Sequence, residues 1–412
     1  MKNNILKYTL LIIGVFFLII IYLSIIGLET QKFNQKIKDK IFQTNNKLDL
    51  KLKKIKLTLD PFSLKINAKT IGPKIVYREK VIELEYVETK ISLIALIKNQ
   101  FSSSNLKIST KSILLKDFVA ILRTLNNRAE LFFLERMIKS GYLIADLELN
   151  FDDNGKIKKD YRINGLIRDS KIDLIKNNSF DKINFLFQIK NNIFNFQDIN
   201  FTTNNIDFFS DALKVTANKK DFIFEGVIAN KKSSLSNKLL KLIKLNFKNI
   251  NFQDINFTSK NNFSFNIDNR FKLKNLALSL DIQIDEGKYK KPDLIKKDFV
   301  DVNDIIHLKD HKITAIYKNE NLTLKGSGKI QLEKEFDQID YLINKKGSDL
   351  SLVSNIVLSE LSIKNRKLSK NFFPKINENI NLKDHQININ FKDKNLTLKG
   401  SGKIQLEKEF DQ

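Results

Sequence analysis

The chain has 412 residues, of which 42% are hydrophobic and 29% are charged, and this composition excludes general disorder. It contains no cysteine, which excludes disulfides, thiolate nucleophiles and cysteine-based metal sites. The net charge of +24 would suit a polyanionic partner, but only eight of the cations are Arg, the residue that base and phosphate recognition favours. Because Lys is spread along the whole chain, we interpret the charge as codon bias and solubility and expect no nucleic-acid partner.

The N-terminal segment predicts a membrane anchor. Tyr8 to Leu28 is a run of 21 residues without a charge, and about 20 apolar residues are needed to cross the hydrocarbon core. No small-residue cleavage site follows, so we expect residues 1–28 to be retained, with Tyr8, Phe16, Ile20 and Leu28 in the membrane. Lysines on both sides leave the orientation ambiguous. No later stretch is long enough to span, so the rest of the chain is expected on one side.

Residues 29–46 have the pattern of an amphipathic helix next to the membrane. Thr30 is a suitable N-cap, and the apolar residues Phe33, Ile37 and Ile41 follow at a spacing of four. We therefore expect a juxtamembrane helix that begins at Thr30.

The apolar period then changes from four to two, which predicts strands. Residues 48–59 alternate, with a slip at Lys53–Lys54 that suggests a bulge. Asp60–Pro61 predicts a turn, and residues 62–68 alternate on the return. This pattern predicts an antiparallel hairpin with one apolar and one polar face.

Short helices are expected to interrupt the strands. One lies near residues 92–98, and another near 117–139, broken at Asn126–Asn127 and ended by Gly141. Residues 143–151 alternate again and predict a strand.

From Tyr161 to Gln412 the pattern is one of repeated strands, with helical breaks near residues 234–245 and 294–300. We divide the part after the juxtamembrane helix into an N-terminal β-rich domain, residues 47–170, and a repeating β-region, residues 171–412. The expected fold class is mainly β: an elongated, repeat-built antiparallel sheet with short helical insertions.

Two internal repeats support a stack of similar units. The octapeptide NFQDINFT occurs at Asn195–Thr202 and again at Asn251–Thr258. The segment Leu308–Gln338 returns as Leu382–Gln412, with 24 of 31 positions identical. Because the first copy continues beyond the point where the second stops, we expect the C-terminus to be a truncation.

The segment Lys325–Lys329, KGSGK, resembles the end of a phosphate-binding loop. That motif would need Gly in place of Thr323 and Ser or Thr in place of Ile330, followed by a helix. The residues around the glycines instead alternate between apolar and polar, which predicts a strand.

The remaining candidates for chemistry are weak. The three histidines, His307, His311 and His385, form no triad, and the second repeat has Asn381 in place of His307, which argues against a metal pair. Paired acids such as Asp152–Asp153 lie in turn sequence, where Asp bonds to the local backbone. We expect no catalytic residue, no metal and no cofactor.

The apolar positions of the strands are the best candidate for a functional surface. In NFQDINFT the apolar residues on either side of Gln197–Asp198 are three apart, which fits a bulge that bends the strand. Gly326 and Gly328 would leave room for curvature or for a chain passing close by. We predict one shared track for lipid, formed by Phe196, Ile199, Phe201, Phe252, Ile255, Phe257, Leu322, Leu324, Ile330 and Leu332.

The layout resembles the AsmA-like superfamily, especially its YhdP-type and TamB-type members. The resemblance rests on the anchor, the linker that begins at Glu29, the 48–68 hairpin and the segment from Gly141 to Gly165. It implies a taco-shaped β-groove in the periplasm of a Gram-negative-type bacterium, anchored in the inner membrane, that conducts phospholipid toward the outer membrane. It also implies an extracytoplasmic body, inner-membrane lipids as partners and further envelope proteins.

An apolar sheet face must be covered by something, and the predicted helices are too few and short to cover it. Either lipid or a second sheet could do so. The alternative function is therefore a self-filled β-sandwich or solenoid that acts as a spacer or adhesin. A transmembrane β-barrel fits less well because of the helical anchor and the absence of Trp.

Overall fold

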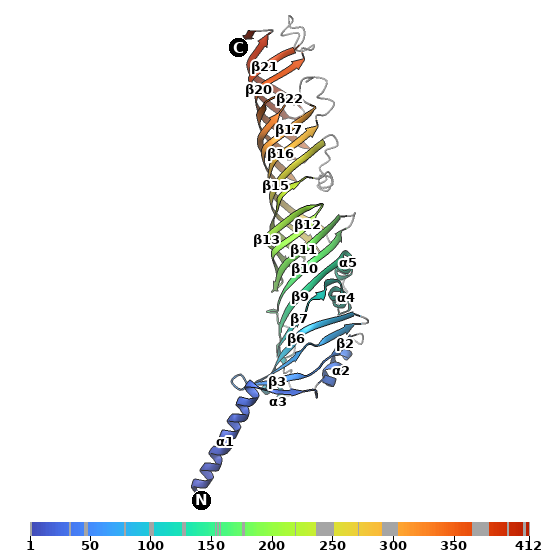
Figure 1. Ribbon diagram of the computed structural model, residues 1–412, viewed down its shortest axis with the longest axis vertical. Helices are drawn as coiled ribbons and strands as arrows, with labels where there is room; N and C mark the ends of the chain where they lie inside the picture. The colour runs from blue at the N-terminus through green and yellow to red at the C-terminus, as the bar shows by residue number, and fades with distance from the viewer. Residues whose placement is uncertain are drawn as a thin grey trace. The chain divides into compact units, whose positions relative to one another are not determined.

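The computed structural model describes the chain except for residues 1, 33, 45–47, 78–79, 99–102, 126–128, 153, 155, 157, 175–177, 219, 236–250, 271, 291–303, 365–378, 394, 407–408 and 412. The fold is mainly β and antiparallel, with few helices, as the sequence predicts (Figure 1). It divides into two compact units, Met1–Phe201 and Thr202–Gln412, and this division lies later than the boundary predicted at 170/171.

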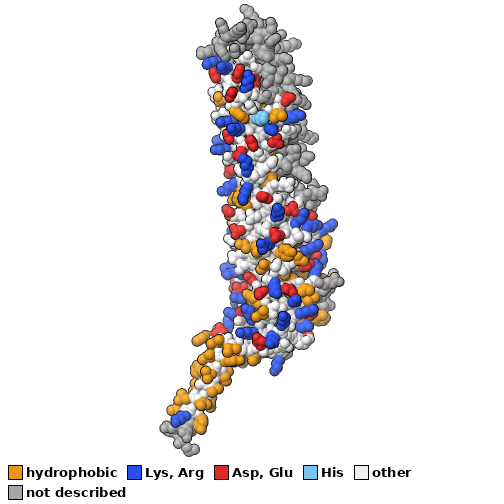
Figure 2. Space-filling model, viewed as in Figure 1, with side chains coloured by type: hydrophobic (Ala, Val, Ile, Leu, Met, Phe, Trp, Pro, Cys, Tyr) orange, Lys and Arg blue, Asp and Glu red, His pale blue; other side chains and the backbone are white. Residues whose placement is uncertain are grey.

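The N-terminal helix is confirmed. Helix α1 spans Lys2–Ile25, and its segment Leu6–Ile25 is long and apolar enough to cross a membrane, with a mean hydropathy of 2.6. Figure 2 shows hydrophobic side chains over most of this helix. Leu28, predicted to lie in the anchor helix, lies beyond its end.

The juxtamembrane helix begins later than predicted. Leu28–Thr30 forms strand β1, which pairs with β3 (Ile55–Asp60), and the helix α2 covers Asn34–Thr44. Thr30 therefore caps no helix; its hydroxyl accepts a hydrogen bond from the Lys32 amide at 3.1 Å. The prediction was wrong here because pairing with a distant strand outweighed the local cap signal. Phe33 lies outside the described residues.

The predicted hairpin is confirmed for its second part, from residue 55 onward, and wrong for its first part. Strand β3 turns at Asp60 and returns as β4 (Lys65–Ile71) in antiparallel register. The segment before it is a separate strand, β2 (Leu48–Lys51), which pairs with β5 (Lys74–Tyr77). The slip at Lys53–Lys54 is thus a break between two strands with different partners, and the predicted bulge was wrong.

The rest of the first unit alternates strands with short helices. Its elements are β6 (Lys80–Ser92), α3 (Leu93–Ile97), β7 (Ser103–Thr110), β8 (Ile113–Leu114), α4 (Leu115–Leu125), α5 (Ala129–Met137), β9 (Ile138–Asn150), β10 (Arg162–Leu174), β11 (Asn178–Lys190) and β12 (Ile193–Thr203). Both predicted helical insertions are confirmed, the second as two helices. The prediction that Gly141 ends the helix was wrong. Gly141 lies inside β9 with φ +127°, and a Cβ there would be 2.7 Å from Ser170 Cβ.

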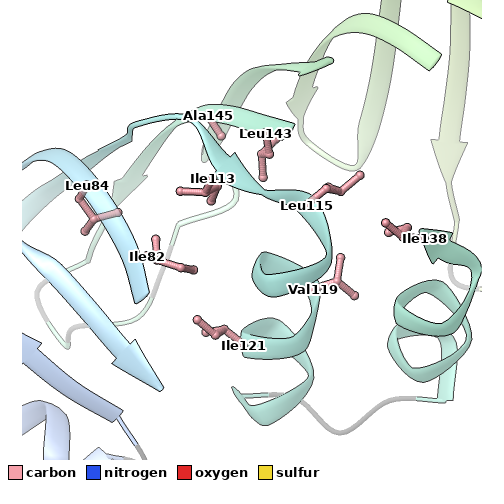
Figure 3. Close-up of a cluster of buried hydrophobic side chains, with 9 residues drawn as sticks. All are labelled: Ile82, Leu84, Ile113, Leu115, Val119, Ile121, Ile138, Leu143 and Ala145. Carbon is pink, nitrogen blue, oxygen red and sulfur yellow. The ribbon is translucent and has the colours of Figure 1, made fainter. Parts of the chain in front are cut away.

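Helix α4 covers the inner face of the sheet in this unit. Its residues Leu115, Val119 and Ile121 are buried against strand residues that include Ile82 and Leu143 (Figure 3). The first unit therefore fills part of its own apolar face.

The second unit is built from strands alone, in the residues that the structure describes after Thr202. These are β13 (Ile206–Ala217), β14 (Asp221–Ser234), β15 (Asn251–Asp268), β16 (Leu273–Lys290), β17 (Ile305–Lys318), β18 (Asn321–Gln331), β19 (Phe336–Lys346), β20 (Asp349–Lys364), β21 (Asn379–Lys392), β22 (Asn395–Leu406) and β23 (Glu409–Asp411). Each pairs antiparallel with the next within one sheet. The predicted helical break near 294–300 lies outside the described residues, as does nearly all of the one near 234–245.

Aspartates in the left-handed region bend several strands. Asp169, Asp198, Asp254, Asp310 and Asp384 have φ values between 49° and 53°. The strand register shifts at four of them, namely in β10, β15, β17 and β21. The bulge predicted in NFQDINFT is thus confirmed at Asp254, and Asp198 has the same backbone conformation.

Candidate functional site

In the second unit we call the face of the sheet that carries the buried residues the inner face. This face carries a continuous row of apolar side chains. Strand register places one residue from each of seven successive strands side by side. We call this row the apolar ladder; it consists of Leu280, Ala315, Leu324, Ile343, Leu352, Phe391 and Leu396. Ala315 is buried, Leu396 is 61% exposed, and the other five are half-buried. The ladder is therefore incompletely covered by the described residues of the protein.

The outer face at the same level is different in character. The residue beside each ladder member, which follows it in β16, β18, β20 and β22 and precedes it in β17, β19 and β21, belongs to a second row. This row consists of Asp281, Thr314, Lys325, Leu342, Val353, Asn390 and Thr397. Five of the seven are polar, and the Thr314 hydroxyl donates to Asp281 at 3.2 Å. The sheet is thus two-sided, with water-compatible groups outside and hydrocarbon inside.

The apolar face closes on itself near the aspartate bulges. Ile206, Ile255, Phe257 and Ile284 form one buried cluster. Leu358 and Leu361 of β20 form another, which includes Ile306 of β17, a strand three positions away. This contact requires the sheet to curve, and it makes the bulge region a filled core while the ladder, farther along the strands, stays half-buried.

The predicted track residues fall into these two environments. Ile255, Phe257 and Ile330 are buried, and Leu322, Leu324 and Leu332 are half-buried. The side chain of Phe252 lies outside the described residues. The described ones in the second unit lie on its inner face, but Ile255 at 2% exposure is a core residue.

The first copy of NFQDINFT lies at the end of the first unit. Phe196 packs edge-on against Phe185, with 5.4 Å between ring centroids, and Phe201 packs against Phe180 at 5.3 Å. Ile199 is half-buried. These aromatic rings occupy the inner face of β11 and β12, and the two copies belong to different units.

The KGSGK segment is a strand, as predicted, and its glycines accommodate rings. It lies within β18, where a Cβ at Gly326 would overlap the Tyr341 ring and one at Gly328 would overlap the His311 ring. The predicted close approach is therefore by side chains of the neighbouring strands. Burial raises the pKa of the Tyr341 hydroxyl.

The histidines do not form a pair. Register places His307 on the outer face of β17, while His311 points inward and is 4% exposed. The His311 Nε2 lies 3.0 Å from the Lys329 carbonyl oxygen, and burial lowers the pKa of the imidazole. His385 is also buried in the second repeat, and its Nδ1 lies 3.0 Å from the Lys383 carbonyl oxygen. The geometry fits a packing role.

A charged cluster lies at the turn between β15 and β16, beside Lys220 from the turn between β13 and β14. A cavity of about 540 Å³ there is lined by Lys220, Asp268, Asn269, Arg270, Lys272 and Lys274. The Lys274 ammonium and the amides of Lys272 and Arg270 lower the pKa of Asp268 to about 2. These bonds stabilise the turn, so the carboxylate is a structural acceptor.

No family model matches the chain, and no curated protein or solved structure matches it. Sequence reasoning missed several ladder members, including Leu280, Ile343, Leu352 and Phe391. Each lies in an alternating strand, which was a usable signal. Their alignment into one row depends on register between strands, which no single segment contains.

Proposed function

We propose that this protein is a membrane-anchored, non-enzymatic lipid-binding protein of the bacterial envelope. Helix α1 would hold it in the inner membrane, and the apolar ladder would hold the acyl chains of phospholipid. By its resemblance to AsmA-like proteins, it would conduct that lipid between the inner and outer membranes through the periplasm.

The apolar ladder is the observation that supports this proposal. It crosses seven strands without a charged residue, and all its members except the buried Ala315 are half-buried or exposed. Among the residues described after Thr202 there is no helix that could lie on it, in contrast to α4 in the first unit. Large apolar surfaces of this kind normally mark a binding site.

Acyl chains suit such a surface for a physical reason. Each CH₂ removed from water contributes about 0.8 kcal/mol, and the contact needs no directional partner. A ladder without hydrogen-bonding groups would therefore bind chains of different lengths, while the headgroups stay in water.

Photo-crosslinking of phospholipid to the purified protein tests the proposal directly. The full chain would be purified in a detergent distinct from bacterial lipids, delipidated, mixed with a photo-crosslinkable phospholipid and irradiated. We expect crosslinks in peptides of β18 to β21, located by mass spectrometry. Crosslinks confined to α1 would mean that the sheet does not bind lipid.

The competing function is a self-filled spacer or adhesin. The fully buried clusters around Ile255 and Leu358 favour it, because they are ordinary core. It predicts that the ladder is covered by protein and that no lipid reaches it. The same crosslinking experiment separates the two functions.

A further inference from the structure

An exposed apolar patch lies at one edge of the first unit. It consists of Phe62 and Leu64 in the turn between β3 and β4, and of Ile94 and Ile97 on helix α3. Phe62 is 100% exposed and Ile97 is 84% exposed; Leu64 and Ile94 are about half exposed, at 48% and 49%. Four large exposed apolar side chains on two neighbouring elements form a patch of the kind that marks an interaction site.

Local hydrogen bonds hold the patch together. Both carboxylate oxygens of Asp60 accept bonds from Ser63, which fixes the turn that presents Phe62. The Leu93 amide donates to the Leu64 carbonyl at 3.0 Å, so α3 begins beside the turn. The Ser92 hydroxyl accepts a bond from the Ala95 amide and caps this short helix. These hydrogen bonds fix the backbone that carries the four apolar side chains.

The patch lies next to the end of α1. Leu28, three residues after the helix, pairs with Leu57 of β3, and a Cβ at Gly27 would overlap the Leu57 carbonyl. The turn begins at Asp60, roughly 10 Å farther along the strand at about 3.3 Å per residue. The headgroup layer of a bilayer is itself several Å thick, so the patch lies within reach of it.

The charges around the patch suit a lipid surface. Lys98 follows Ile97 directly, and Lys90 is close enough to lower the pKa of the Asp60 carboxyl, behind its bonds to Ser63. Lys98 and Lys90 are both exposed. Apolar side chains flanked by Lys are typical of segments that enter the membrane interface.

We infer that the β3–β4 turn and helix α3 insert into the headgroup region of the same membrane that α1 spans. This inference rests on the proposed anchoring by α1. It gives the protein a second contact with the membrane beside its helix. Two contacts would fix the tilt of the first unit relative to the membrane, with the β3–β4 end of its sheet toward the lipid.

Tryptophan fluorescence can test the inference, because the natural chain contains no Trp. The full-length variants Phe62→Trp and Ile97→Trp would be reconstituted in vesicles of phosphatidylcholine and phosphatidylglycerol. Phosphatidylcholines brominated at two depths, near the headgroup and near the end of the acyl chain, would serve as quenchers. We expect a blue shift and a loss of emission at both positions.

Two further variants separate the possible failures. Phe17→Trp, in α1, reports whether the helix is embedded; Tyr142→Trp, on the outer face of β9 and 47% exposed, reports on the rest of the unit. Quenching at 17, 62 and 97 but not at 142 supports the inference. Quenching at 17 alone would overturn it and leave the anchor intact. Quenching at none would overturn both, and quenching at 142 as well would mean that the contact is not made by this patch.

Discussion

The imidazole of His311 occupies the space that a side chain at position 328 would need, because Gly328 lies beside it on the paired strand. The same relationship exists between His385 and Gly402 in the second repeat. Each repeat therefore combines a buried ring with a glycine on the next strand. A sequence that resembles a phosphate loop is, in this protein, a strand with room for rings.

The duplicated unit offers a matched test of this packing. A Cβ at Gly326 would overlap the Tyr341 ring, whereas one at the equivalent Gly400 would lie 3.9 Å from its nearest neighbour, the Gln386 carbonyl oxygen. We expect Gly326→Ala to lower the free energy of unfolding by about 1–3 kcal/mol. Gly400→Ala should be neutral or stabilise by about 0.5 kcal/mol. Urea denaturation followed by circular dichroism would measure both, and equal effects would contradict the ring-packing account.

Burial of His311 predicts a dependence of stability on pH. Its pKa is lowered in the folded protein, so below the ordinary value of 6.5 the unfolded chain binds a proton more readily. Stability should be greatest above about pH 6.5 and fall as the pH drops below it. The thermal midpoint would be compared at about pH 7.5 and about pH 5.5.

The variant His311→Gln removes this titration and should reduce the difference between the two midpoints. His307→Gln, on the outer face, is the control and should leave the difference as in the natural protein. If His311→Gln loses as much stability on acidification as the natural chain, the buried imidazole is not the source.

Sequence reasoning predicted the fold where a pattern is local. Alternation predicted β18 around Gly326, and the three-residue spacing predicted the bulge at Asp254. It failed where a distant strand decides the structure, as for Leu28–Thr30, which pairs with β3 in place of beginning a helix. The apolar face of each strand could be predicted, but the alignment of Leu324 with Leu352 required the register.

The left-handed aspartates should tolerate only certain side chains. Asp310 has φ 53°, a conformation that Asn adopts readily and that β-branched residues avoid. We expect Asp310→Val to lower the free energy of unfolding by about 1–2 kcal/mol and Asp310→Asn to have little effect. Because Asn also removes the charge, an equal loss in both variants would point to electrostatics and away from backbone strain.

The two faces of β20 give a paired test of lipid binding. Leu352 belongs to the ladder, while its neighbour Val353 is 51% exposed on the outer face. An ionised carboxylate resists desolvation, so Leu352→Asp should reduce crosslinking to phospholipid by about tenfold or more. Val353→Asp should crosslink like the natural chain. Both variants would first be checked for natural far-ultraviolet circular dichroism, and equal crosslinking by the two would rule out the ladder as the binding surface.

The agreement between the two long repeats has a consequence for how such a protein changes its length. The 74-residue step from Leu308 to Leu382 corresponds to four strands, β17 to β20, after which β21 repeats the bulge and the buried histidine of β17. Each inserted unit would bring its own bend, its own hairpin turns and its own ladder residues, and its last strand would offer backbone groups to the next. The number of strands in the sheet can then change in evolution by duplication of a gene segment, without a change to an existing core.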